Sequence, residues 1–220
     1  VGFLREQDVS KGFIDKVLGI IGIDSISPLH VVVDTGNGMV GPILQRVFEK
    51  LTIKTTGLYL EPDGNLPNHG LDPMQPENRD ELQKRVLEEK AEIGFAFDGD
   101  GDRFFVIDDR GEFIPGDFIA ALIGCYMLER YPGGKIIYDV RCSWAIRDSV
   151  QDAGGTALIE RVGHSFIKPR MYEEGAIYAG ELSGHHYFRD FYYCDSGMIP
   201  WLLVAELMSR ENTSLSSMIE

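Results

Sequence analysis

The sequence predicts an α/β fold made of two tandem, duplicated domains, each a mixed sheet flanked by helices. Helical and strand patterns alternate along the 220 residues, which is typical of sheets covered by helices. The order of elements in the first half then repeats in the second half, which indicates an internal duplication. The strand ending at Asp34 corresponds to the strand ending at Asp139. In the same way, the strand before Asp98 corresponds to the strand before Glu181.

In the first half, apolar spacing and turn residues place the elements. We expect helices over residues 9–21, 40–51 and 77–90, and strands over residues 30–33, 53–60, 93–97 and 104–108. Pro76 stands directly before the third helix as a start signal. Residues 62–76 form a loop rich in Pro, Asn and Gly, and a loop of this length without a regular element is usually functional or mobile.

The second half follows a turn at residues 109–111, where we place the boundary between domains of residues 1–109 and 110–220. Asp117 is expected to cap the first helix after this turn. We expect helices over residues 117–131, 144–153, 166–174 and 196–209, and strands over residues 135–139, 156–161 and 177–179. Residues 215–220 look like the opening of another helix and the chain begins without Met, so we expect it to be part of a longer protein.

Composition narrows the class of protein. Hydrophobic residues make up 44% and charged residues 25%, as in an ordinary globular protein. A formal net charge of −14 repels phosphate backbones and anionic lipid, so we expect neither nucleic acid nor membrane as a partner. Three cysteines, without CxxC spacing, argue against a disulfide framework or a zinc site and fit a reducing cytoplasm.

Three aspartates at alternate positions predict a metal loop. Asp98, Asp100 and Asp102 follow an apolar strand, and the glycines between them allow the backbone to curl. Three converging carboxylates repel one another unless a cation lies among them. Such hard oxygen ligands favour Mg²⁺, with Ca²⁺ or Mn²⁺ as lesser alternatives.

Other interpretations of the metal loop exist. It could be a solvated acidic turn, or a DxD nucleophile of the haloacid-dehalogenase type, which spacing alone does not exclude. A calcium EF-hand requires Gly at the sixth and Glu at the twelfth position, where this chain has Arg103 and Asp109. Arg103 can bind phosphate oxygens in a forked geometry, or it can simply neutralise the aspartates.

A second polar loop, residues 180–185, predicts a ligand site. Glu181 and Ser183 suit vicinal sugar hydroxyls, and His185 adds an imidazole, although an ordinary polar loop is an equal alternative on spacing alone. His164 precedes a predicted helix start, where backbone N–H groups favour anions. The alternative is that Ser165 caps this helix and His164 is a surface residue.

Two cations stand near this loop. Arg141 follows the strand that ends at Asp139, and Lys168 lies in the predicted helix of residues 166–174. Both can add positive charge for an anionic ligand, and each alone is more often a plain surface cation.

Together these segments resemble the α-D-phosphohexomutase family over nearly the whole chain. Residues 98–103 match its magnesium loop and residues 180–185 its GExSGH sugar loop, and further similar segments are residues 34–38, 62–67, 162–171 and 187–197. Of these, residues 34–38, 62–67 and 187–197 match its phosphomannomutase/phosphoglucomutase branch. The family has four domains around a deep cleft, and this chain resembles the second and third.

The resemblance implies a magnesium-dependent mutase. It implies that Asp98, Asp100 and Asp102 ligate Mg²⁺, and that Glu181 and Ser183 read sugar hydroxyls, with His185 supporting that substrate-binding loop. It further implies that Arg103, Arg141 and His164 line the cleft near the transferred phosphoryl group. We expect Lys168, as an added cation, to bind substrate. The expected substrate is a hexose phosphate, interconverted between its 1- and 6-phosphates through a phosphoserine and a hexose 1,6-bisphosphate.

One departure from the family matters. Its phosphoserine lies in a Thr-Ala-Ser-His-Asn-Pro-like loop upstream, and its phosphate-clamping loop lies in a fourth domain, and neither is in this sequence. The chain alone is therefore expected to bind but not to turn over. Phosphoglucosamine mutase, or a non-catalytic module that binds phosphosugar or metal, are the alternatives.

Overall fold

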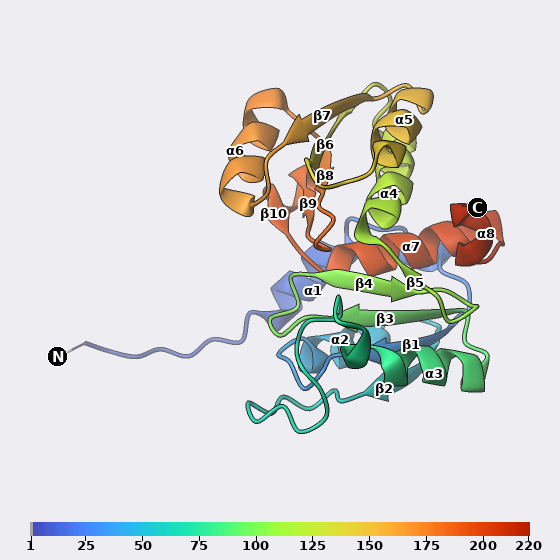
Figure 1. Ribbon diagram of the computed structural model, residues 1–220. Helices are drawn as coiled ribbons and strands as arrows, with labels where there is room; N and C mark the ends of the chain where they lie inside the picture. The colour runs from blue at the N-terminus through green and yellow to red at the C-terminus, as the bar shows by residue number, and fades with distance from the viewer. Residues whose placement is uncertain (1) are drawn as a thin grey trace.

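The computed structural model describes residues 2–220 and contains two five-stranded mixed sheets, one in each half of the chain (Figure 1). The elements of the first half are α1 Ser10–Leu18, η1 Ile23–Ser25, β1 His30–Asp34, α2 Gly41–Phe48, β2 Lys54–Leu58, η2 Pro76–Asn78, α3 Asp80–Glu89, β3 Ile93–Phe97, β4 Phe104–Ile107 and β5 Phe113–Ile114. Those of the second half are α4 Gly116–Arg130, β6 Lys135–Asp139, α5 Trp144–Asp152, β7 Thr156–Glu160, α6 His164–Glu174, β8 Tyr178–Gly180, β9 His186–Phe188, η3 Arg189–Phe191, β10 Cys194–Asp195, α7 Met198–Glu211 and α8 Leu215–Ile219.

The two sheets have the same topology. Their strand orders are β2-β1-β3-β4-β5 and, read from the other end, β7-β6-β8-β9-β10. In each sheet the first three strands are parallel, and the last two pair antiparallel. The duplication inferred from the order of elements is therefore confirmed. Because β3 and β8 occupy equivalent places, the loops that follow them lie at equivalent edges of the two sheets.

Alternation along β1 explains why helices cover both faces of the first sheet. Val31 and Val33 of β1 contribute to one core, whereas Val32 contributes to another that includes Leu82 and Val86 of α3. Successive side chains of a strand point to opposite faces, so β1 is buried on both sides. In the second sheet, Ile137 of β6 likewise faces α6, while its neighbours along the strand face α4 and α5.

Helix α7 joins the two halves. It follows the second sheet in sequence, yet Trp201 is fully buried with its ring centroid 5.5 Å from that of Phe95 in β3 and 5.7 Å from that of Phe48 in α2. Figure 1 shows α7 running along β4 beneath the second domain, and it also contacts α4. One apolar cluster therefore contains residues of both domains.

The longest apolar run in the sequence lies in α4. This helix contacts α5 and β8, and ten of its 15 residues are buried, so the run serves the core. None of the helices between residues 2 and 220 combines the length and apolarity needed to cross a membrane.

Three short strands and one cap differ from expectation. Strands β5, β9 and β10 have two or three residues each, too few for an alternating pattern to reveal them. The first sheet thus continues to Ile114, past the turn in which we placed the boundary, and the boundary itself stays a prediction. Asp117 does not cap α4. It lies inside that helix and accepts a hydrogen bond from the Ser143 N–H (2.9 Å) at the start of α5.

Candidate functional site

The metal loop follows β3 and curls as expected. One carboxylate oxygen of each of Asp98, Asp100 and Asp102 lies within 4.8 Å of the others. Gly101 has a φ of +76°, and a Cβ at this position would lie 2.7 Å from the Cβ of Val40. Glycine is required here on both grounds, because another residue would be strained at positive φ and its Cβ would clash with Val40, just before α2.

The electrostatics of this loop favour a bound cation. Asp98 is buried, and burial together with the charge of Asp98 raises the pKa of Asp102 to about 6. The loop therefore carries charge repulsion that a cation would relieve. Its three donors are hard carboxylate oxygens, and Asp100 remains exposed, so the residues present fit an ion such as Mg²⁺ that keeps several waters.

Arg103 is held against the metal loop. Its Nε donates to Asp98 Oδ2 at 2.6 Å, and its Nη1 lies 3.6 Å from Asp72 Oδ1. The backbone N–H of Arg103 also donates to Asp98 Oδ1 at 3.1 Å. The guanidinium thus partly neutralises Asp98, and with a quarter of its side chain exposed it keeps further N–H groups for a ligand.

Glu181 is the buried centre of the second polar loop. One of its oxygens accepts from the Gly163 N–H (3.0 Å) and the other from the Tyr187 hydroxyl (2.7 Å). His185 Nδ1 lies 3.2 Å from the same carboxylate. Burial alone would raise the pKa of Glu181, but these hydrogen bonds hold it below its usual range. Glu181 is thus a fixed carboxylate acceptor.

Arg141 faces this loop because Asp139 orients it. The Asp139 carboxylate, fully buried at the end of β6, accepts from Nε and Nη2 of Arg141 at 3.0 Å each. Arg141 Nη2 then lies 3.4 Å from Ser183 Oγ and 3.9 Å from Glu181 Oε1. Such a fork fixes the guanidinium plane and leaves its outer edge for an anion.

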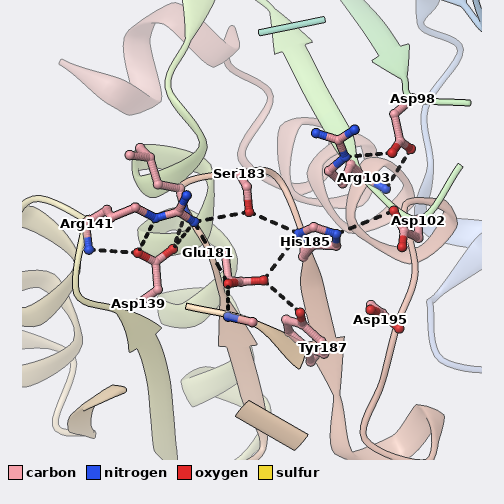
Figure 2. Close-up of polar contacts among 12 residues, drawn as sticks. Asp98, Asp102, Arg103, Asp139, Arg141, Glu181, Ser183, His185, Tyr187 and Asp195 are labelled. Carbon is pink, nitrogen blue, oxygen red and sulfur yellow. Dashed lines mark hydrogen bonds and ion pairs between the residues drawn. The ribbon is translucent and has the colours of Figure 1, made fainter. Parts of the chain in front are cut away.

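The two loops meet where the domains touch. Arg103 and His185 form an isolated antiparallel bridge, and the Phe104 N–H donates to Gly184 O at 3.0 Å. His185 Nε2 lies 3.6 Å from Asp102 Oδ1, so this imidazole stands between Asp102 and Glu181 (Figure 2). Burial alone would lower the pKa of His185, yet the Glu181 hydrogen bond and the Asp102 charge raise it.

Lys168 and His164 lie beside this centre. Lys168 Nζ donates to Asp195 Oδ1 at 2.9 Å. Helix α6 begins at His164, two residues earlier than expected, so Ser165 lies inside the helix and does not cap it. His164 is exposed, and its side chain makes no hydrogen bond or ion pair within residues 2–220. The structure thus brings together all predicted site residues except His164, which stands at the rim next to Gly163.

Three residues of this centre had no predicted role: Asp139, Tyr187 and Asp195. Asp139 orients Arg141, Tyr187 binds Glu181, and Asp195 binds Lys168. The available indication was positional, since Asp139 ends β6, which pairs with the strand that precedes Glu181. The other two lie in residues 187–197, a segment that resembles the family, but nothing in the spacing marked either of them individually.

Comparisons with known proteins agree with this geometry. The family model described as phosphoglucomutase/phosphomannomutase, alpha/beta/alpha domain II, matches residues 11–111, and the model for domain III matches residues 115–220. A phosphomannomutase of Salmonella typhimurium is 44% identical over 99% of this chain and 49% of its own length. The chain therefore spans about half the length of this relative.

Solved structures give the same result. A phosphoglucomutase/phosphomannomutase family protein of Burkholderia thailandensis matches with a TM-score of 0.92 at 38% identity, over 98% of this chain and 46% of that one. An N-acetylphosphoglucosamine mutase of Aspergillus fumigatus, in complex with GlcNAc-6P and magnesium, matches with a TM-score of 0.69 over 94% of this chain and 52% of that one. Its identity of 13% makes this a likeness of fold alone.

Proposed function

Since the chain belongs to the phosphoglucomutase/phosphomannomutase family, we propose that it carries the cation-binding and sugar-binding parts of a phosphohexomutase. The reaction proposed moves a phosphoryl group between the 1- and 6-hydroxyls of a hexose, with mannose and glucose phosphates as substrates. A relative 44% identical to this chain is named a phosphomannomutase, which favours this substrate class.

One observation carries the proposal most directly. The metal loop and the sugar loop come from different domains, yet His185 Nε2 and Asp102 Oδ1 lie 3.6 Å apart and the backbones of Arg103 and His185 pair. A hexose held at Glu181 therefore has a phosphoryl group within reach of the metal loop. Phosphoryl transfer depends on this kind of positioning and on charge neutralisation more than on covalent chemistry by the protein.

The proposed cation site consists of Asp98, Asp100 and Asp102. When bound there, Mg²⁺ would neutralise negative charge on the group being transferred. Arg103 supports the same task from the side, because Asp98 and Asp72 orient its guanidinium and leave part of it exposed. The Aspergillus fumigatus enzyme that shares this fold holds magnesium, which agrees with the proposed metal.

The proposed sugar site consists of Glu181, Ser183 and Arg141. Glu181 has a lowered pKa and accepts hydrogen bonds, so it suits sugar hydroxyls as an anionic acceptor. Ser183 lies between Arg141 and His185, with Oγ 3.0 Å from His185 Nδ1, and can donate or accept. Arg141, fixed by Asp139, offers a fork for the phosphate that does not react.

Turnover is proposed to need more than this chain. The family mechanism begins with a phosphoserine that donates its phosphoryl group, forms a bisphosphate and recovers the other phosphoryl group. The printed sequence contains no Thr-Ala-Ser-His-Asn-Pro-like loop, so flanking domains would supply that serine. We propose that the chain alone binds ligands without turnover. A cytoplasmic location remains part of this proposal and agrees with the three free thiols.

Two measurements test the proposal. The first is calorimetric titration of the chain with Mg²⁺. Asp100→Asn should abolish Mg²⁺ binding, whereas Asp148→Asn, at an exposed aspartate of α5, should leave it unchanged. The second assays the chain joined to its flanking domains on glucose 1-phosphate and mannose 1-phosphate, with Mg²⁺ and a trace of hexose 1,6-bisphosphate. Turnover lost in Asp100→Asn supports a mutase. If neither sugar phosphate is turned over, the proposal is overturned for mannose and glucose phosphates. Glucosamine phosphate is then the next substrate to assay.

A further inference from the structure

Asp102, His185 and Asp195 bring three metal-ligating groups together from three segments of the chain. Asp102 lies in the metal loop of the first domain, His185 precedes β9, and Asp195 ends β10. One ligand atom of each lies within 4.8 Å of the others. We propose that these side chains form a second cation site, which takes a borderline transition-metal ion such as Zn²⁺ beside the oxygen-only site.

His185 is oriented as a metal ligand would be. Its Nδ1 lies 3.2 Å from Glu181 Oε2, outside the proposed trio, while Nε2 points toward Asp102 Oδ1 at 3.6 Å (Figure 2). Nε2 has no hydrogen-bond partner in the described part of the chain. Histidines that bind metals usually donate their other nitrogen to a carboxylate, which fixes the ring and strengthens the ligand. A metal ion would take the place of a proton on Nε2.

The donor set distinguishes the two sites. Asp98 and Asp100 offer only oxygen, which suits Mg²⁺, whereas an imidazole with two carboxylates suits Zn²⁺, Ni²⁺ or Co²⁺. Zinc binds such ligands at about 2.0–2.2 Å, so ligand atoms on one ion lie about 3–4 Å apart. The trio therefore needs to close by about an ångström. Because both sites use Asp102, an ion in the second site would compete for this carboxylate with an ion in the oxygen-only site.

Lys168 is the built-in competitor of such an ion. Its ammonium lies 2.9 Å from Asp195 Oδ1, and a metal must displace it. The Lys168 side chain is 31% exposed, whereas that of Asp195 is 17% exposed, so the lysine can swing into solvent while the carboxylate stays. Removing the ammonium should therefore tighten metal binding. This inference goes beyond the mutase proposal and needs no turnover for its test.

The test is calorimetric titration of the tag-free chain with Zn²⁺, with and without excess Mg²⁺, and with Co²⁺ as a spectroscopic probe. We expect one Zn²⁺ per chain, an affinity lower by about tenfold or more in Asp195→Asn, and no change in the control Asp148→Asn. Lys168→Met should bind Zn²⁺ more tightly than the wild type. Asp100→Asn should lose Mg²⁺ while keeping Zn²⁺ and the visible absorption of bound Co²⁺.

Two results would overturn the site. Equal Zn²⁺ affinity in Asp195→Asn and wild type would exclude Asp195 as a ligand. Lys168→Met removes no ligand, so its Zn²⁺ affinity tests the site even if Asp195→Asn fails to fold. Loss of Zn²⁺ together with Mg²⁺ in Asp100→Asn would place the zinc in the oxygen-only site. If the chain binds Zn²⁺ but no Mg²⁺, the mutase proposal fails and the second site stands.

Discussion

Glu206 of α7 and Arg130 of α4 form an ion pair at 2.6 Å, with the Glu206 side chain only 6% exposed. Arg130 Nη1 also donates to Ile20 O at 2.7 Å, and Glu206 Oε1 accepts from the Gly22 N–H at 3.0 Å. The pair therefore ties the segment before β1 to helices of the second domain. The N-terminus of α7 lies beside the metal loop, where the Gly197 N–H donates to Gly101 O at 3.2 Å.

Glu206→Gln should destabilise the chain by about 1–3 kcal/mol. The substitution removes the charge that Arg130 and two further donors use, and a buried group left without its partner bears the full cost of desolvation. Urea unfolding followed by circular dichroism measures the change. The matched control is Glu129→Gln, which breaks the exposed pair with Arg210 and should change stability by less than about 0.5 kcal/mol. Equal effects of the two variants would contradict the prediction.

A second ion pair predicts a pH dependence of stability. His69 Nε2 lies 3.1 Å from Asp34 Oδ2, and Nδ1 lies 2.7 Å from Gly70 O, so both nitrogens face acceptors. The Asp34 hydrogen bond raises the pKa of His69 above its ordinary value of 6.5. Its contribution to stability is therefore fully present below about pH 6.5 and is lost as the pH rises through the raised value.

The stability difference between wild type and His69→Gln should follow this sign. We expect about 1–2 kcal/mol near pH 5.5 and a smaller difference near pH 9, measured by urea unfolding at each pH. His164→Gln, at an exposed histidine, should show almost no difference at either pH. A His69→Gln difference that stays constant with pH would mean that His69 contributes through packing alone.

How far the sequence predicts this molecule depends on the range of each interaction. Asp34 and Asp139 each end a short buried strand at the same place in the repeated order of elements, so their equivalence was visible in the sequence, and the two sheets confirm it. The metal-loop aspartates are spaced within five residues, and their convergence was visible too. That the two loops meet through His185 depends on packing between domains, which no local pattern records.

Local sequence patterns do not predict side-chain contacts that depend on hairpin register or on long-range packing. Tyr187 reaches Glu181 only because β8 and β9 pair with Gly180 opposite His186, and both strands have three residues. His69 meets Asp34 across 35 residues of chain, from a loop that showed only turn residues. In each case the sequence shows the residue types, but it does not show which side chains contact one another in the fold.

Tyr187→Phe tests the support of Glu181. The hydroxyl donates to Glu181 Oε2 at 2.7 Å, and its loss leaves a buried carboxylate with one partner fewer. We expect a loss of about 1 kcal/mol in the free energy of unfolding and a raised Glu181 pKa, because this hydrogen bond helps to lower it. Thermal unfolding and carboxylate NMR titration measure the two effects. Tyr172→Phe, at a tyrosine that is 74% exposed, should show neither.

Gly101→Ala tests whether the curl of the metal loop depends on glycine. The residue has a φ of +76°, and an added Cβ would meet the Val40 Cβ at 2.7 Å, so both strain and a clash oppose the substitution. We expect about 1–3 kcal/mol of destabilisation and weaker Mg²⁺ binding, because the aspartates on either side lose their common direction. Gly64→Ala is the control, since Gly64 lies in open space without a positive φ and should tolerate a methyl group. Wild-type stability and Mg²⁺ affinity in Gly101→Ala would show that the loop holds its three carboxylates together without help from this backbone position.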